Sequence, residues 1–161
     1  MRVVAIDQST TSTRAYVLNT DGLGEIVCAR THKQCYPNSG WVEHDPEELL
    51  GNIITCLDAA GSVDAIGIAN QGESCLGWDA RTGEPVSPVI VWQDRRTKGV
   101  IQQLKSSGIE SLVVDKTGLS LDSYFSATKL AWIVNNIPKA RELLEQGYLR
   151  LGTTDAFFLD R

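Results

Sequence analysis

A short apolar run at the start of the chain leads directly into a cluster of hydroxyl side chains and then into a second strand-like run. The first run ends at Ile6, an acid follows at Asp7, residues 9–13 supply five consecutive hydroxyls, and the second run spans residues 15–18. So short a link favours a β-hairpin over the strand–turn–helix unit of the common nucleotide-binding motifs. Neither G-x-x-x-x-G-K-[ST] nor G-x-G-x-x-G occurs in the chain.

The residue types in this turn suit a polyphosphate carrying a metal ion. The Asp7 carboxylate can hold Mg²⁺ through water, while hydroxyls and turn amides can donate to phosphate oxygens. Arg14 adds a cation at the end of the cluster. The alternative is a purely structural turn, because Ser and Thr hydroxyls often satisfy local backbone groups.

Length and charge limit the class of protein. The chain has 161 residues, 42% of them hydrophobic and 22% charged, which is typical of one soluble globular domain. The net charge is −5 and Lys and Arg do not cluster in any run, so we expect neither nucleic acid nor an anionic membrane as a partner. No apolar stretch is long enough to cross a bilayer, and the N-terminus lacks the features of a secretory signal.

The cysteines and histidines show no ligand spacing. No C-x-x-C pair occurs, so we expect reduced, partly buried thiols in a cytoplasmic protein at Cys28, Cys35, Cys56 and Cys75. His32 and His44 lie twelve residues apart without further ligands, and neither is predicted to bind metal.

The first predicted helix has clear boundary signals. Asp45 suits the N-cap, Pro46 the first helical position, and Glu48 can close a capping box, while Gly61 ends the helix. An apolar face at helical spacing is predicted for Leu49, Leu50, Ile53, Ile54 and Leu57.

The remaining pattern predicts an α/β layered domain. An antiparallel meander is predicted for residues 3–6, 15–18 and 25–31, followed by strands at 65–69 (expected to be buried), 74–78 and 89–92. Helices are predicted for residues 98–105, 126–135 and 138–146. A hairpin that carries a phosphate loop resembles the ribonuclease-H-like nucleotide-binding fold of actin and hexokinase, a mixed sheet flanked by helices.

Four segments carry more specific patterns: IDQSTTSTR at 6–14, GWVEHDPEE at 40–48, the stretch from Ile68 through NQGE at 70–73 to IVWQDRRT at 90–97, and TGLSLDSYFSATKL at 117–130. Together, in this order and spacing, they resemble the N-terminal domain of the FGGY carbohydrate kinases, and most closely the glycerol kinase branch of that family. The resemblance extends over essentially the whole chain.

The resemblance implies transfer of the γ-phosphoryl group of ATP to a hydroxyl of a small polyol or sugar. It implies that Asp7 organises Mg²⁺ and that phosphates are faced by Thr10, Thr11, Ser12 and Arg14. These groups fit the chemistry, because phosphoryl transfer depends mainly on positioning and charge neutralisation. Ser9 stands where glycerol kinases usually have Gly, a change expected to crowd the phosphates.

The resemblance also implies a polyol pocket. Glu73, Trp92 and Tyr124 match family positions that hold the substrate: the acid accepts hydroxyl hydrogen bonds, the indole covers C–H faces, and the phenol donates or accepts. Gly72 replaces the family's arginine, which removes up to five donors and leaves space for a larger polyol or a branched or charged substrate. Taken one at a time, these residues could instead be a surface acid and packing aromatics.

Other polar residues receive structural roles. Asp94 is expected near the N-cap of the helix that follows it, with some ion pairing to the adjacent arginines. Lys129 is expected on a solvated helix face, and residues 41–48 are assigned to helix initiation.

The family has two actin-like domains, so the resemblance implies that residues 1–161 form an incomplete N-terminal domain and that the second domain is absent from this chain. The general base and the adenine-binding segment would follow Arg161, and residues 1–161 alone are expected to be inactive. The alternatives are a pentulose or other sugar kinase of the same family, or a non-catalytic module of the same fold. A homo-oligomer is compatible with the resemblance, although no residue pattern marks a contact surface.

Overall fold

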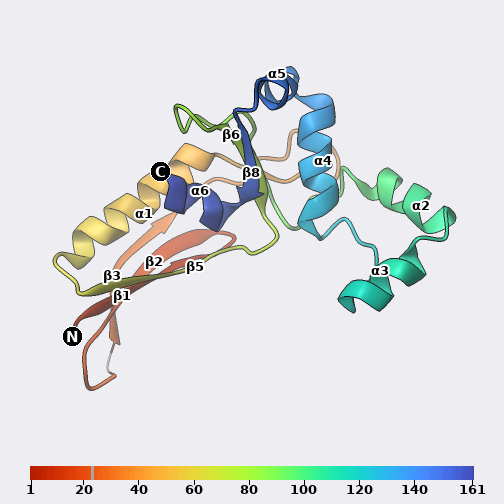
Figure 1. Cartoon of the computed structure of the whole chain (residues 1–161). Coiled ribbons are helices and arrows are strands. Elements are labelled where there is room, and N and C mark those ends of the chain that lie inside the picture. The colour runs from red at the N-terminus through yellow and green to blue at the C-terminus, as the bar shows by residue number, and fades with distance from the viewer. Residues whose placement is uncertain (23) are drawn as a thin grey trace.

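The structure is a computed structural model that describes residues 1–22 and 24–161. Its strands form two four-stranded sheets, and its helices cover and join them (Figure 1). The first sheet has the order β3-β2-β1-β5 and consists of β1 (Val3–Gln8), β2 (Ser12–Leu18), β3 (Gly24–Thr31) and β5 (Ala65–Ala69). The second has the order β4-β7-β6-β8 and consists of β4 (Glu43–His44), β7 (Val89–Ile90), β6 (Cys75–Asp79) and β8 (Leu149–Thr153).

The helices follow the predicted order with two additions. They are α1 (Pro46–Ala60), α2 (Lys98–Ser106), α3 (Glu110–Thr117), α4 (Ser126–Asn136), α5 (Pro138–Gln146) and α6 (Thr154–Asp160). The sequence did not predict α3 and α6. In α3 the apolar residues 112–114 are consecutive, so they lack the helical spacing from which such elements are recognised.

The first sheet confirms the predicted meander and mixed topology. β1 pairs antiparallel with β2, β2 pairs antiparallel with β3, and β1 pairs parallel with β5 after the crossover through α1. In this register Asp7 lies directly opposite Arg14, so both side chains belong to the same face of the sheet.

Helix α1 begins and ends as its sequence predicts. The Asp45 carboxylate accepts hydrogen bonds from the N–H groups of Glu47 (2.9 Å) and Glu48 (3.3 Å). Gly61 ends the helix at a φ of 67°, a conformation that favours glycine. The predicted capping box is not found among the described hydrogen bonds, because the Glu48 carboxylate accepts from the N–H of Lys33 (3.2 Å) and ties the helix start to the segment after β3.

The main core includes residues of both sheets together with one face of α1 and of α6. Apolar residues of β1, β2 and α1 pack in one cluster with residues of β6 and α6. Trp78 and Phe157 meet edge to face, with ring centroids 5.5 Å apart. The prediction for Ile54 was wrong, because this side chain is half exposed and the buried positions of the last turns are Cys56 and Ala60.

Strand β5 was correctly located, but the expectation that it is buried was wrong. Its residues are mostly exposed, and Ile66 is 55% exposed. The physical reason is its position, since β5 is at the end of its sheet while α1 packs over β1, β2 and β3.

Helices α2 and α3 form an arm that extends away from the two sheets, whereas α4 and α5 pack on the second sheet (Figure 1). The arm is joined to α4 by residues 118–125, and this segment leads back toward the sheets. Within the described part of the chain, no helix combines the length and apolar character needed to span a membrane.

Candidate functional site

A cavity of about 280 Å³ lies where the β1–β2 turn faces the loop after β5, and we call it the polar pocket. It is lined by Asp7, Gln8, Ser9, Thr10, Asn70, Gln71, Gly72, Glu73, Trp92 and Tyr124. Seven residues singled out in the sequence therefore share one cavity, although they come from four separate segments. Its volume suits a small ligand.

The turn between β1 and β2 is held in place by hydrogen bonds that its carbonyl groups accept. The N–H of Ser9 donates to the carbonyl of Ser12 (2.9 Å), and the Thr10 carbonyl accepts from Nε2 of His32 (2.9 Å) and from the amide of Gln34 (3.1 Å). Within the described residues, the N–H groups of Thr10 and Thr11 have no hydrogen-bond partner. Free adjacent amides beside hydroxyls make a suitable anion-binding turn.

Three residues predicted to face phosphates do not line the polar pocket. Thr11 is exposed at the tip of the turn, Ser12 is buried at the start of β2, and Arg14 is exposed two residues further along the strand. Arg14 shares its sheet face with Asp7, so the turn and this face together present an acid and a cation.

The Asp7 carboxylate is partly buried and faces the pocket. The hydroxyl of Ser9 donates to Asp7 Oδ1 (2.7 Å), so Ser9 turns toward the acid. Among the described residues, no group of three or more His, Cys, Asp or Glu is arranged to hold a metal ion. A single carboxylate still fits Mg²⁺, which commonly binds one or two carboxylates and completes its coordination with water and phosphate oxygens.

Glu73 joins the pocket to the start of α4. Its Oε2 atom accepts from the N–H of Ser126 (2.7 Å) and from the hydroxyl of Ser126 (2.5 Å). The carboxylate thus supplies a cap that the residue preceding the helix, Phe125, does not provide. Because both bonds use Oε2, Oε1 can accept from a ligand.

Two aromatic rings form the wall opposite the turn. The indole N–H of Trp92 donates to the hydroxyl of Thr10 (3.1 Å), and the Trp92 and Tyr124 rings meet edge to face at 5.7 Å. The backbone N–H of Trp92 donates to Ser74 Oγ (3.1 Å). This hydrogen bond fixes the backbone from which the ring extends, just after β7.

A buried amide network beneath the pocket was missed from the sequence. The Gln71 amide donates to Gln8 Oε1 (3.2 Å), and the Ser74 hydroxyl donates to Gln71 Oε1 (3.2 Å). The network joins the turn to the loop after β5. Gln71 lies in the NQGE segment, so its position next to Gly72 and Glu73 was the available signal.

The amide of Asn70 extends this polar region toward α6. It donates to the hydroxyl of Thr154 (3.0 Å) and to Asp155 Oδ1 (2.9 Å). The hydroxyl of Thr153 also donates to Asp155, and this hydrogen bond is the main cause of the lowered pKa of the Asp155 carboxyl.

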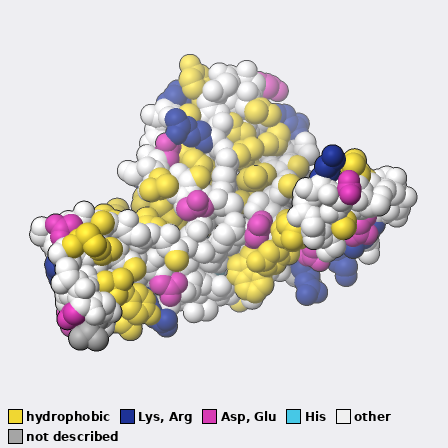
Figure 2. All heavy atoms as spheres, turned by 60° about the horizontal axis from the view of Figure 1, so that its bottom comes forward, with side chains coloured by type: hydrophobic (Ala, Val, Ile, Leu, Met, Phe, Trp, Pro, Cys, Tyr) yellow, Lys and Arg dark blue, Asp and Glu magenta, His cyan; other side chains and the backbone are white. Residues whose placement is uncertain are grey.

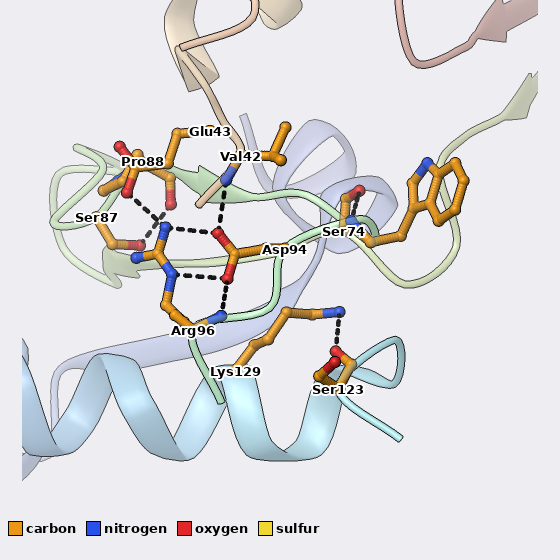
Figure 3. Close-up of polar contacts among 10 residues, drawn as sticks. Val42, Glu43, Ser74, Ser87, Pro88, Asp94, Arg96, Ser123 and Lys129 are labelled. Carbon is orange, nitrogen blue, oxygen red and sulfur yellow. Dashed lines mark hydrogen bonds and ion pairs between the residues drawn. The ribbon is translucent and has the colours of Figure 1, made fainter. Parts of the chain in front are cut away.

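The expectation that Lys129 is solvated was wrong, because its side chain is fully buried. Its ammonium group donates to the carbonyl of Tyr124 and to that of Ser123 (3.4 Å; Figure 3). Burial lowers the pKa of Lys129, although neighbouring carboxylates partly oppose this effect. Lys129 therefore fixes the backbone that carries one pocket residue.

Asp94, expected near the N-cap of the following helix, lies three residues before Thr97, which is the N-cap of α2. Asp94 is instead buried, where it accepts from the N–H of Val42 (2.7 Å) and pairs with Arg96 (2.9 Å; Figure 3). Arg96 also pairs with Glu43 (2.7 Å). The expected ion pairing is present, and it joins the strand segment before α1 to the end of the second sheet.

Trp41 completes this buried cluster. The Arg96 guanidinium lies 3.9 Å from the centroid of the Trp41 ring and 4.6 Å from that of Trp132. Such stacking suits the planar guanidinium. The structural role assigned to residues 41–48 agrees with these contacts.

The similarity to known proteins extends over nearly the whole chain. The family model described as "FGGY family of carbohydrate kinases, N-terminal domain" matches residues 2–160. Glycerol kinase 1 of Pseudomonas aeruginosa is 49% identical over 99% of this chain and 34% of its own length. Glycerol kinase of Koribacter versatilis is 47% identical over 98% of the chain and 33% of its own length. The chain thus spans about a third of the length of these relatives.

Solved structures give the same fold. A glycerol kinase of Plasmodium falciparum with ADP superposes with a TM-score of 0.83 at 30% identity, covering 97% of this chain and 33% of that one. A ligand-bound xylulose kinase of Lactobacillus acidophilus gives a TM-score of 0.84 at 18% identity, covering 98% of this chain and 32% of its own. At that identity the second likeness shows the fold alone, which is the actin- and hexokinase-like fold expected from the hairpin.

Proposed function

The chain belongs to the FGGY family of carbohydrate kinases, whose N-terminal domain it matches, and we propose that the protein containing it phosphorylates a hydroxyl of a small polyol or sugar with ATP. The observation that carries the proposal is the polar pocket, which joins the Asp7 turn to Glu73, Trp92 and Tyr124. The glycerol kinases among the relatives support a polyol as the acceptor.

In this proposal the turn binds the phosphates. The free amides and the hydroxyls of Thr10 and Thr11 donate to phosphate oxygens, and Arg14 adds a positive charge on the face that it shares with Asp7. Ser12 contributes to phosphate binding in two ways: its carbonyl accepts the hydrogen bond that closes the turn, and its hydroxyl can donate to a phosphate oxygen. Asp7 holds Mg²⁺ through water, and that ion would neutralise charge on the transferring phosphoryl group.

The opposite wall binds the acceptor. Glu73 Oε1 accepts a hydrogen bond from a hydroxyl, Tyr124 donates or accepts another, and the Trp92 ring covers the C–H face of the substrate. A mixed lining of this kind satisfies each hydroxyl that loses its water. Gly72 leaves room beside the acid, so a pentulose remains the second candidate acceptor.

The general base is assigned to the rest of the protein. The chain spans about a third of the relatives' length, and the proposal treats residues 1–161 as part of an N-terminal domain that acts with a second domain. A cytoplasmic location is also proposed, in keeping with four free cysteines among the described residues.

The test is a kinase assay on the full-length protein. ATP and Mg²⁺ are supplied with glycerol, longer polyols and pentuloses, and ADP release is measured for the wild type and for the variants Asp7→Asn and Glu73→Gln. We expect each variant to lower kcat/KM by about a hundredfold. Glu145→Gln, an exposed acid on α5, is the matched control and should match the wild type.

Transfer to no polyol or sugar would refute the proposal. So would Asp7→Asn and Glu73→Gln enzymes that are as active as the Glu145→Gln control. A panel in which pentuloses exceed glycerol would keep the kinase assignment and replace the acceptor.

A further inference from the structure

A second cavity adjoins the polar pocket and has a different lining. Its volume is about 390 Å³, and we call it the apolar cavity. Most of its lining is hydrocarbon, from Ile101, Val113, Leu119, Leu121 and Phe125. Figure 2 shows hydrophobic side chains gathered on this side of the molecule where the arm of α2 and α3 meets the body.

The two cavities share part of their walls. Gly72 and Glu73 line both of them, so the two cavities are adjacent at these residues. A ligand that binds Glu73 in the polar pocket therefore lies beside the apolar cavity.

Gly72 lies at this boundary, and its backbone conformation is one that any residue can adopt. Its φ is not in the left-handed region, and a Cβ built on it would meet no atom within 4 Å. A larger residue would fit the backbone and would project into open space at the junction. The fold therefore does not require glycine at this position, and the space beside its backbone is empty at the boundary.

We propose that the polar pocket and the apolar cavity form one binding region, and that the preferred acceptor is a short polyol carrying an apolar substituent at one end. This inference rests on the proposed kinase function and names its substrate class. The hydroxyl end lies between Glu73, Trp92 and Tyr124, and the substituent passes Gly72 toward Leu119 and Phe125. Apolar burial adds about fourfold in affinity for each methylene removed from water.

The experiment measures binding to the full-length protein, with Mg·ADP present, by titration calorimetry. The probes are glycerol and its 1-O-methyl, 1-O-butyl and 1-O-hexyl ethers, and the readout is the ratio of the glycerol Kd to the ether Kd within each variant. For the wild type we expect a ratio that rises along the series and reaches at least about 30 for the butyl ether.

Two variants test the path of the substituent. Gly72→Leu should reduce the butyl ratio to near one, because its side chain fills the junction, and Leu119→Gln should reduce it severalfold. Gly51→Leu on α1 is the matched control, because a Cβ there also meets no atom within 4 Å and Gly51 lines neither cavity. It should keep the wild-type ratio.

Equal affinities along the series would overturn the inference, as would a butyl ratio that survives both Gly72→Leu and Leu119→Gln. If glycerol is phosphorylated but the ethers bind no more tightly than glycerol, this inference is wrong and the kinase function stands. If affinity rises along the ether series but no ATP is consumed, the kinase function is wrong and the joined binding region stands.

Discussion

The two walls of the polar pocket are positioned by different means. The turn wall, residues 7–10, links two hydrogen-bonded strands, and side chains from the segment after β3, His32 and Gln34, hold the Thr10 carbonyl. The aromatic wall, made of Glu73, Trp92 and Tyr124, comes from three segments and depends on buried polar groups outside the pocket. The first wall therefore belongs to one hairpin, whereas the second brings together residues from three separate segments.

The largest effect is expected at a buried ion pair, Asp94 with Arg96, which closely follows Trp92 of the aromatic wall in the chain. Asp94→Ala leaves Arg96 without its main partner, and the side chain of Arg96 is only 1% exposed. We expect a loss of about 3–5 kcal/mol in the free energy of unfolding, measured by urea denaturation.

The exposed pair of Lys139 and Glu142 provides the control. Glu142→Gln removes a surface ion pair of 3.0 Å and should change stability by less than about 0.5 kcal/mol. Equal effects of the two substitutions would show that the buried Asp94–Arg96 pair stabilises the fold no more than a surface pair does.

The contact between His32, which holds the Thr10 carbonyl of the turn, and His44 of β4 should make the protein acid-sensitive. Their rings meet at 4.6 Å, and burial lowers the pKa of His44 to about 4, with a smaller contribution from the His32 charge. In the unfolded chain the imidazole of His44 takes up a proton near pH 6.5. Between pH 6.5 and 4 the unfolded state therefore binds more protons than the folded state does. Stability is complete above pH 6.5 and should fall by about 3 kcal/mol as the pH drops to 4.

The measurement is urea unfolding at several pH values for the wild type and for His44→Phe. The difference in slope between them isolates His44 from the acidic residues that titrate in the same range. Parallel curves would mean that His44 is accessible to protons in the folded state.

A smaller effect is expected for the buried lysine. Lys129→Met leaves the carbonyls of Ser123 and Tyr124 without their donor, which should cost about 1–3 kcal/mol of stability. Because Tyr124 lines the pocket, KM for the polyol should also rise in the full-length enzyme. Lys116→Met on the exposed side of α3 should change neither quantity, and an unchanged KM in the Lys129 variant would remove its link to Tyr124.

The smallest effect concerns the single hydrogen bond between the walls. Thr10→Val removes the acceptor of the Trp92 indole N–H, and Trp92→Phe removes the donor. A double-mutant cycle of unfolding free energies should give a coupling of about 0.5–1.5 kcal/mol. A coupling near zero would indicate that the walls meet without a stabilising contact.

The same contrast explains how much the sequence predicts. The meander, the cap of α1 and its end at Gly61 follow from signals within a few residues, and each was predicted. Strands β4 and β7 have two residues each, so their place in a second sheet depends on pairing with distant segments. Exposure of β5 depends on which strands α1 covers, and strand composition carries no information on that point.

The candidate site follows the same rule. Asp7 and Thr10 are recognisable from the hairpin, and Glu73, Trp92 and Tyr124 from the family resemblance. Burial of Lys129 could not be predicted, because its acceptors are backbone carbonyls that any sequence possesses. The contact of Gln8 with Gln71 joins residues separated by 63 positions, which no local pattern specifies.

The most direct test is a crystal structure of the full-length protein with Mg·ADP and a bound polyol. The account predicts phosphate oxygens at the amides of Thr10 and Thr11, and a polyol hydroxyl at Glu73 with the carbon chain against Trp92. A nucleotide whose phosphates lie away from this turn, or a polyol bound outside the polar pocket, would contradict it.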